Sequence, residues 1–225
     1  MRWVKTMPDV SLASRTTPKR EALIVVDIQN DFCAGGALAV PDAEAIIPGI
    51  NALMDLFGTV VLTQDWHPAD HRCFASAHPG QTCYASIEMA YGEQVLWPDH
   101  CVQGTLGADF HPALVQRAQY VVRKGFRPEI DSYSAFFEND RSTATGLAEW
   151  LRTRGIEAIT LVGLATDFCV AYSALDAVRE GFRVTVMTDL CRAIDLEGSA
   201  ARALDAMRTA GVNLRASDSL CDSRQ

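Results

Sequence analysis

The sequence predicts an α/β protein of one domain, with three α/β/α layers built around a six-stranded, mainly parallel sheet. Short apolar runs rich in β-branched residues alternate with segments of helical spacing, and three of those segments end at a glycine. Continuous apolar runs are typical of parallel strands buried on both faces, and glycine often follows the last residue of a helix. Strands and helices in alternation are joined by right-handed crossovers, which place helices on both faces of the sheet.

The first half of the chain supplies three expected strands and one helix. Ala22–Ile28 (ALIVVDI) is a short apolar run that predicts a buried strand. Ala43–Phe57 has apolar residues at helical spacing and predicts a helix. Thr59–Thr63 (TVVLT) and Tyr120–Arg123 (YVVR) predict the next two strands. The long stretch 65–112 is rich in His, Cys, Pro and Gly, so we expect a functional loop with little regular structure.

The second half alternates more regularly. Ser142–Arg154 predicts a helix that ends at Gly155, and Ala158–Gly163 (AITLVG) predicts the strand that follows. Asp167–Glu180 predicts a helix that ends at Gly181. The remaining expected elements are a strand at 183–187, a helix at 196–210 that ends at Gly211, and a short strand at 212–214.

Composition excludes several classes of protein. The chain has 225 residues, 28 acidic and 20 basic side chains and a net charge of −8, with no basic run, so we expect neither nucleic acid nor a membrane as a partner. It contains no stretch near the ~20 apolar residues of a membrane span. Its seven cysteines are odd in number and irregularly spaced, which predicts a reduced, cytoplasmic protein. Residues 1–20 are predicted to form a flexible extension, and residues 21–225 the domain.

Polar side chains follow four of the predicted strands. Asp27, Asp65 and Lys124 each stand at or just after the end of a strand, and Cys169 begins the helix after another. Alone, each has an ordinary explanation as a turn residue, a surface charge or a small buried hydrophobe. Ligands bind outside the carboxyl ends of strands in open parallel sheets, so together these residues predict a catalytic site.

The predicted site suits covalent catalysis by a thiolate. We expect the start of a helix, capped by Thr166 or Asp167, to lower the pKa of the Cys169 thiol, and Lys124 to lower it further. Asp27 would take the thiol proton and return it to a leaving group. Removal of Lys124 or Asp27 is therefore expected to raise the pKa of the thiol.

The histidines suggest a metal site beside this thiol. All five lie within residues 67–111. Asp65 and His67 stand two apart in extended chain, where both side chains point to one side, and the later His100 joins them. Two imidazoles and one carboxylate leave coordination positions open for a substrate. No Cys-x-x-Cys spacing favours a structural zinc site, and a polar loop histidine without a metal is the ordinary alternative for each residue.

Over residues 21–215 the chain resembles the nicotinamidase/pyrazinamidase branch of the isochorismatase-like cysteine hydrolases. The D-x-Q, Lys and A-T-D-x-C elements mark the superfamily, and the more specific D-W-H-P and W-P-x-H-C elements resemble the metal-binding part of nicotinamidases. The motifs are D-I-Q-N-D-F at 27–32, T-Q-D-W-H-P at 63–68, W-P-D-H-C-V-Q-G-T at 97–105, R-K-G at 123–125 and V-G-L-A-T-D-F-C-V at 162–170.

The resemblance implies a role for each matching residue. It implies a catalytic triad and a pocket for the substrate ring. It implies a site for one divalent transition metal ion, which is zinc in the first place, with iron or manganese as alternatives. It also implies an oxyanion hole of two backbone amides, beside a cis peptide between Leu164 and Ala165. Relatives differ on whether a histidine near His71 is a further ligand, and Cys73 stands where they more often have serine. The residues are Asp27, Lys124 and Cys169 for the triad; Asp65, His67 and His100 for the metal; Phe32, Trp97, Tyr133 and Phe168 for the pocket; and Ala165 and Cys169 for the oxyanion hole.

The resemblance implies hydrolysis of nicotinamide to nicotinate and ammonia, and of pyrazinamide to pyrazinoate, in NAD salvage. A small amide would be the partner of the site, in a monomer or a homo-oligomer. The nearest alternative is a related hydrolase acting on another small amide, an N-carbamoyl compound or a vinyl ether. A non-catalytic metal-dependent binding protein has no need of an activated thiol, and a non-haem iron oxygenase leaves Asp27, Lys124 and Cys169 without roles.

Overall fold

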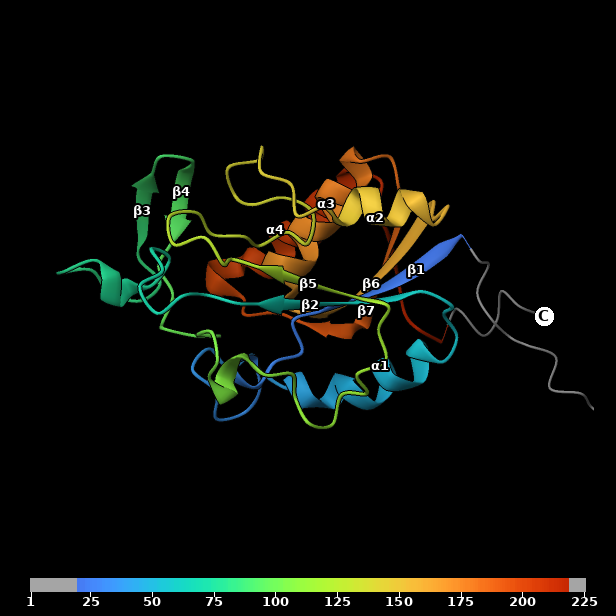
Figure 1. The fold of residues 1–225 in the computed structure, drawn as a ribbon, viewed down its shortest axis with the longest axis horizontal. Coiled ribbons are helices and arrows are strands. Elements are labelled where there is room, and N and C mark those ends of the chain that lie inside the picture. Colours follow the sequence, from blue (N-terminus) through green and yellow to red (C-terminus); the bar gives the residue numbers. More distant parts are fainter. Residues whose placement is uncertain (1–19, 219–225) are drawn as a thin grey trace, which may run out of the picture.

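The computed structural model describes residues 20–218 and confirms the predicted α/β fold (Figure 1). Six strands form one sheet in the order β5-β2-β1-β6-β7-β8, and every neighbouring pair is parallel. The strands are β1 (Glu21–Val26), β2 (Val60–Asp65), β5 (Tyr120–Lys124), β6 (Ala158–Leu164), β7 (Arg183–Arg192) and β8 (Asn213–Arg215).

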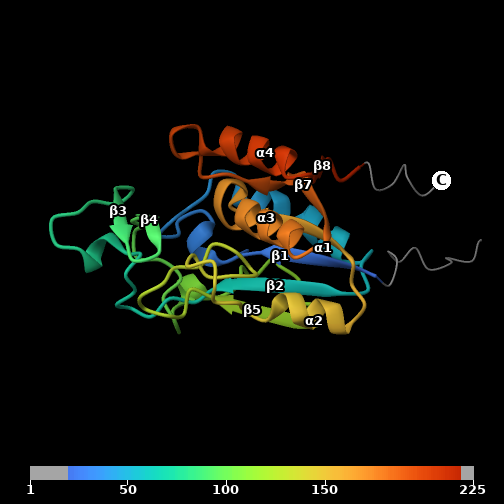
Figure 2. The same cartoon turned by 90° about the horizontal axis from the view of Figure 1, so that it is seen from above.

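Helices cover both faces of the sheet, as the handedness of the crossovers requires. The chain passes from β1 to β2 in one direction across the sheet, and from β5 to β6 and on through β7 to β8 in the other. Right-handed connections therefore place the first helix on one face and the later three on the opposite face, which Figures 1 and 2 show. The helices are α1 (Ile47–Met54), α2 (Leu147–Thr153), α3 (Ala171–Arg179) and α4 (Ser199–Thr209).

The central strands carry the core. All six residues of β2 are buried, and five of the six in β1 are buried. The strand predicted at 22–28 ends earlier, at Val26, because Asp27 adopts a left-handed backbone conformation with φ of 48° that turns the chain out of the sheet. The last residue of β5 is Lys124, which the sequence placed just beyond the strand.

Several helices are shorter than expected, and left-handed residues explain two of the differences. The helix predicted at 43–57 is a 3-10 turn, Ala43–Ile46, followed by α1. The helix predicted at 142–154 begins only after Gly146, and the one predicted at 196–210 only after Gly198, both of which have positive φ. Such residues interrupt a helix, which apolar spacing does not reveal.

The expectation that residues 65–112 have little regular structure is wrong in one part. β3 (Ser86–Met89) and β4 (Gly92–Val95) form an antiparallel hairpin that projects from the end of the sheet (Figure 1). Its strands are short and only partly buried, so their composition gives no strong strand signal. Among the described residues, no helix is both long and apolar enough to cross a membrane.

Candidate active site

The site lies at the carboxyl end of the sheet, where the strand order reverses between β1 and β6. Asp27 follows β1, Asp65 ends β2, Lys124 ends β5, and Cys169 lies in a π-helical turn, Thr166–Val170, between β6 and α3. Ligands of open parallel sheets bind at such a reversal. Four segments that are far apart in sequence thus bring their side chains to one place.

Lys124 is the centre of the arrangement. Its Nζ lies 2.9 Å from Asp27 Oδ2 and 3.3 Å from Cys169 Sγ. The same ammonium donates to the Ser132 carbonyl at 3.0 Å and to Asp65 Oδ1 through a short hydrogen bond. The side chains of Lys124 and Asp27 are fully buried. A buried ammonium held between two carboxylates is a fixed charge, because loss of its carboxylate partners would leave a buried charge uncompensated.

The electrostatics of the thiol differ from the expectation. Burial raises the pKa of Cys169 well above its usual range, while Lys124 acts to lower it and Asp27 adds to the rise. The expectation that the thiol pKa is lowered overall is therefore wrong in this structure, although the predicted direction of the Lys124 effect is confirmed. The expectation that loss of the Asp27 charge raises the thiol pKa is also wrong, because the carboxylate is one of the groups that raise it.

The charged partners respond to burial and to each other. Burial raises the pKa of Asp27, and Lys124 only partly offsets this effect. Burial would raise the pKa of Asp65 too, but Lys124 and the two nearby imidazoles hold it well below its usual range. Burial would lower the pKa of Lys124, yet the two carboxylates raise it well above its usual range. The site therefore holds one firmly charged Lys124–Asp65 pair and one carboxyl group, Asp27, suited to gaining and losing a proton.

The predicted helix caps are wrong. No side-chain hydrogen bond caps the turn that contains Cys169, which begins after Ala165. The Asp167 carboxylate instead accepts hydrogen bonds from the backbone amides of Ile194 at 3.0 Å and Asp195 at 2.8 Å, and from the Ser199 hydroxyl. Asp167 thus ties the turn of the nucleophile to the loop that enters α4.

The backbone before Cys169 has an unusual conformation. The peptide between Leu164 and Ala165 is cis, which confirms the expectation. The preceding Gly163 has φ of 117°, and a Cβ there would lie 2.2 Å from the Val26 carbonyl oxygen. Only glycine lets β6 approach β1 this closely. The structure thus brings the amides of Ala165 and Cys169 into the same short turn.

Asp65, His67 and His100 (the Asp65 group) are buried together and could hold a metal ion. The Nε2 atoms of His67 and His100 lie 3.7 and 3.8 Å from Asp65 Oδ2. The Nδ1 atom of His67 lies 2.8 Å from the Gly125 carbonyl, and that of His100 lies 2.8 Å from the Pro98 carbonyl. Each Nδ1 therefore carries a proton, and each Nε2 faces the carboxylate, as in metal sites whose histidines are oriented by backbone carbonyls. The residues fit a divalent ion.

His71 lies beside this group rather than in it. Its ring centroid is 4.4 Å from that of His67, and it forms a second donor group with His67, Cys73 and Asp131 that does not include Asp65 or His100. The Cys73 amide donates to His71 Nδ1 at 3.1 Å, and His71 Nε2 has no hydrogen-bond partner among the described residues. Burial lowers the pKa of His71 to about 4, so the ring is neutral. Its service as a further ligand stays a prediction.

The four aromatic residues expected around a substrate ring do gather in one pocket. Trp97 Nε1 donates to Tyr133 Oη at 3.1 Å, and the edge of Trp97 meets Phe168 at 4.8 Å between ring centroids. The remaining cavity is about 20 Å³, little more than one water position. The aromatic walls must therefore move to admit a ring. The lining includes Phe32, Trp97, Tyr133, Phe168, Asp65, His100 and Cys169.

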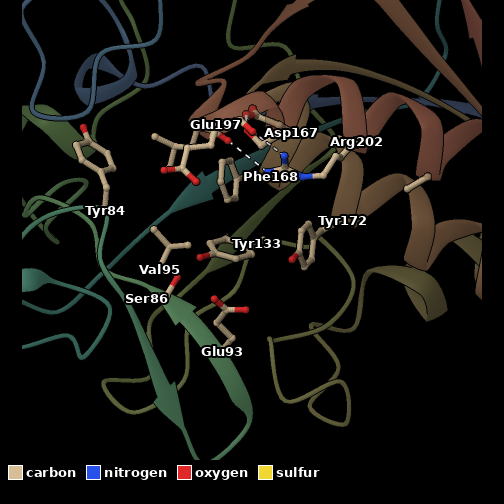
Figure 3. Close-up of a pocket in the computed structure, with 14 residues that line it drawn as sticks. Tyr84, Ser86, Glu93, Val95, Tyr133, Asp167, Phe168, Tyr172, Glu197 and Arg202 are labelled. Atoms are coloured by element: carbon tan, nitrogen blue, oxygen red, sulfur yellow. Dashed lines mark hydrogen bonds between the residues drawn. The ribbon is translucent and has the colours of Figure 1, made fainter.

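A larger cavity of about 600 Å³ lies outside this pocket, between the β3–β4 hairpin and α4 (Figure 3). Tyr133 and Phe168 line both cavities, so these two rings separate them. The outer cavity also exposes Glu93, Glu197 and Arg202, but no member of the Asp27–Lys124–Cys169 arrangement and no member of the Asp65 group. This lining fits an entrance to the active site better than the place where the reaction occurs.

Sequence reasoning missed three supporting residues. Thr63 Oγ1 donates to Asp27 Oδ1 at 2.6 Å and accepts from the Asp27 amide. The Gln29 side chain makes two 2.8 Å hydrogen bonds with the backbone of Asp65, one to its amide and one to its carbonyl. A Cβ on Gly125 would lie 2.4 Å from the His67 ring. All three stand inside the motifs quoted above, but only the tertiary contacts disclose what they do.

Comparison with known proteins decides the family. The family model described as the isochorismatase domain matches residues 21–219. The chain belongs to the isochorismatase family. Within it, a nicotinamidase from Acinetobacter baylyi is 55% identical over 192 residues, 85% of this chain and 90% of the relative.

Two solved structures are similar in fold to this chain over most of its length. An Acinetobacter baumannii protein described as a nicotinamidase and pyrazinamidase has a TM-score of 0.90 and 53% identity, and the match covers 91% of this chain and all of that one. A Pyrococcus horikoshii pyrazinamidase in complex with zinc has a TM-score of 0.72 and 36% identity, with 88% of this chain and 99% of that chain covered.

Proposed function

We propose that the protein is an amide hydrolase that converts nicotinamide to nicotinate and ammonia, and pyrazinamide to pyrazinoate, for NAD salvage. The observation that carries the proposal is the contact of one buried ammonium, Lys124 Nζ, with Cys169 Sγ at 3.3 Å and Asp27 Oδ2 at 2.9 Å, directly beside the Asp65 metal group. The similarity to proteins named nicotinamidase supports the substrate.

The first half of the reaction forms a thioester. The sulfur of Cys169 attacks the carboxamide carbon as its thiol proton passes to Asp27, whose Oδ2 is paired with Lys124 Nζ at 2.9 Å. Thr63 donates to the other carboxylate oxygen and so fixes the orientation of the carboxylate. We assign the amides of Ala165 and Cys169 as donors to the oxyanion that develops on the carbonyl oxygen. Asp27 then gives its proton to the nitrogen, the carbon–nitrogen bond breaks, and ammonia leaves.

The second half regenerates the thiol. A water molecule attacks the thioester carbon and gives a proton to Asp27, the carbon–sulfur bond breaks, and the proton returns to sulfur as the acid is released. Lys124 remains protonated throughout. Its charge offsets the negative charge that passes between Asp27 and Cys169, which lowers the cost of forming a thiolate in a buried site.

Asp65, His67 and His100 would hold the metal, which we propose to be zinc. When bound, the ion would supply a Lewis-acid contact for the pyridine nitrogen and so orient the ring. The aromatic residues Phe32, Trp97, Tyr133 and Phe168 would enclose that ring, because a flat apolar substrate is held best by apolar walls with few polar contacts. We propose that the enzyme works in the cytoplasm, in keeping with the free state of the six described cysteines.

The first experiment is to incubate the purified protein with nicotinamide and to measure ammonia. We expect release by the wild type and none by Cys169→Ala. Comparison of kcat/KM for nicotinamide, pyrazinamide and benzamide then tests the ring anchor, since benzamide lacks the ring nitrogen and should be poor. Equal rates for benzamide and nicotinamide would refute the anchoring role. Release of ammonia from an N-carbamoyl amino acid, but not from nicotinamide, would favour the alternative hydrolase.

A further inference from the structure

Three groups of possible metal donors in the described structure contain residues of the active site. A fourth group contains none of them: Cys33, Glu44 and His111, whose donor atoms all lie within 4.8 Å of one another. We propose that these three residues form a second metal site, for a divalent ion that accepts a thiolate ligand, such as zinc or cobalt.

The three ligands come from separate segments that converge in space. Cys33 follows the 3-10 turn Asn30–Phe32 after β1, Glu44 lies in the turn Ala43–Ile46 that leads into α1, and His111 comes from the far end of the long loop. Sulfur, nitrogen and carboxylate oxygen together are a donor set that zinc commonly takes, with one position left for water.

Hydrogen bonds hold these ligands in place. The Ala34 amide donates to Glu44 Oε1 at 2.6 Å, which fixes the carboxylate beside Cys33. The His111 amide donates to the Ile28 carbonyl at 2.9 Å, which fixes the histidine beside the same loop. The backbone amide of Glu44 itself also donates to this carboxylate, and with the Ala34 amide it lowers the pKa of Glu44 and favours the charged form.

Electrostatics show that the three groups interact. Burial, together with the nearby Glu44 carboxylate, raises the pKa of the Cys33 thiol to about 11. His111 acts in the other direction on Glu44 and favours its charged form. Without an ion the thiol is protonated; on binding, the thiol proton leaves to solvent and sulfur coordinates as thiolate.

The site needs only a small adjustment to accept an ion. Donors of a tetrahedral zinc site lie roughly 3.3–3.7 Å apart, so a separation at the 4.8 Å limit must shrink by roughly 1.1–1.5 Å and shorter separations by less. The Ala113 amide approaches His111 Nδ1 at 3.2 Å, and this long hydrogen bond would be lost if Nε2 binds the ion. Glu44 and His111 are only half-buried, so an ion can enter from solvent, whereas Cys33 is buried.

A site here would join two parts of the active-site surroundings. Cys33 directly follows Phe32, which lines the ring pocket. His111 lies at the end of the long loop that carries His100. An ion would therefore clamp the loop after β1 against the long loop. Its expected effect is on stability, because it binds the folded chain and not the unfolded one.

Cobalt absorption provides a test that does not depend on catalysis. The Asp65 group contains no cysteine, so a thiolate-to-cobalt charge-transfer band in the near ultraviolet reports a cysteine ligand. We expect this band in the wild type and in His100→Ala, which removes a ligand from the other group. Cys33→Ser should abolish it, Glu44→Gln should weaken cobalt binding at least tenfold, and Cys83→Ser, at an exposed cysteine outside every donor group, should leave it unchanged.

Stability supplies the second readout. In the His100→Ala background, zinc should still raise the melting temperature, and addition of Cys33→Ser should remove that rise. A band that persists in Cys33→Ser, a band that disappears in Cys73→Ser, or the absence of any band in the wild type at saturating cobalt would overturn the proposal. None of these results depends on nicotinamide being the substrate, so the proposed function and the second site can fail separately.

Discussion

Gly125 is expected to be essential for the metal site although it donates no side chain. Its φ is +65°, and an added Cβ would lie 2.4 Å from Cε1 and 2.7 Å from Nδ1 of His67. The same residue's carbonyl orients that ring through a 2.8 Å contact with Nδ1. In Gly125→Ala the ring must therefore move and lose its orientation, so the position of Nε2 near Asp65 is lost as well.

The magnitude follows from a matched control. Gly155 has φ of +69° at the end of α2, and a Cβ there would meet nothing within 4 Å. Gly155→Ala should cost about 1–2 kcal/mol, the ordinary strain of a left-handed residue that is not glycine. Gly125→Ala should cost that amount plus the clash, and should weaken metal binding by about 10–100-fold, the usual effect of losing the partner that orients a ligand. A tenfold loss corresponds to about 1.4 kcal/mol.

Zinc competition with a chelator, and urea unfolding with and without zinc, measure the two effects. Zinc should stabilise wild type and Gly155→Ala equally, and Gly125→Ala by about 1.4–2.8 kcal/mol less. If Gly125→Ala binds zinc as tightly as Gly155→Ala, then the clash with His67 does not matter and the assignment of that ring as a ligand fails.

Three further predictions concern the reacting groups and their support. Cys169→Ala should abolish ammonia release while the urea midpoint stays near that of wild type, and Cys83→Ala should keep full activity; turnover by the first variant would exclude a thioester. In the metal-free protein, the rate of alkylation of Cys169 should rise only above the pH at which an ordinary thiol ionises. Lys124→Ala should move this pH profile to still higher pH, and Asp27→Asn should move it to lower pH. Shifts in the opposite sense would contradict the charge arrangement. Asp167→Asn should lower the free energy of unfolding by roughly 1.5–3 kcal/mol, because its carboxylate accepts three hydrogen bonds; an unchanged urea midpoint would show that they contribute little.

The outer cavity bears on how substrate reaches the thiol. Tyr133 and Phe168 separate it from the ring pocket, which has room for little more than a water molecule. The aromatic walls that select a flat ring must therefore also open to let it pass. The larger of the two cavities would then receive the substrate before the walls open, and it contains no reacting group.

The sequence by itself determined the order along the chain of the six strands of the main sheet and of the four helices, and the end of that sheet at which polar residues collect. These follow from local signals, since buried parallel strands are apolar throughout and glycines end helices. That is why Asp27, Asp65, Lys124 and Cys169 could be placed at one rim before any contact was known.

Tertiary structure alone decided how those residues behave. The pKa of Cys169 is raised rather than lowered because burial costs a charged thiolate more than Lys124 returns, and burial is a property of the packed chain. Likewise, Asp167 binds the loop before α4 instead of capping its own helix. His71 lies outside the Asp65 group because its position depends on the path of a long loop, which no local periodicity specifies.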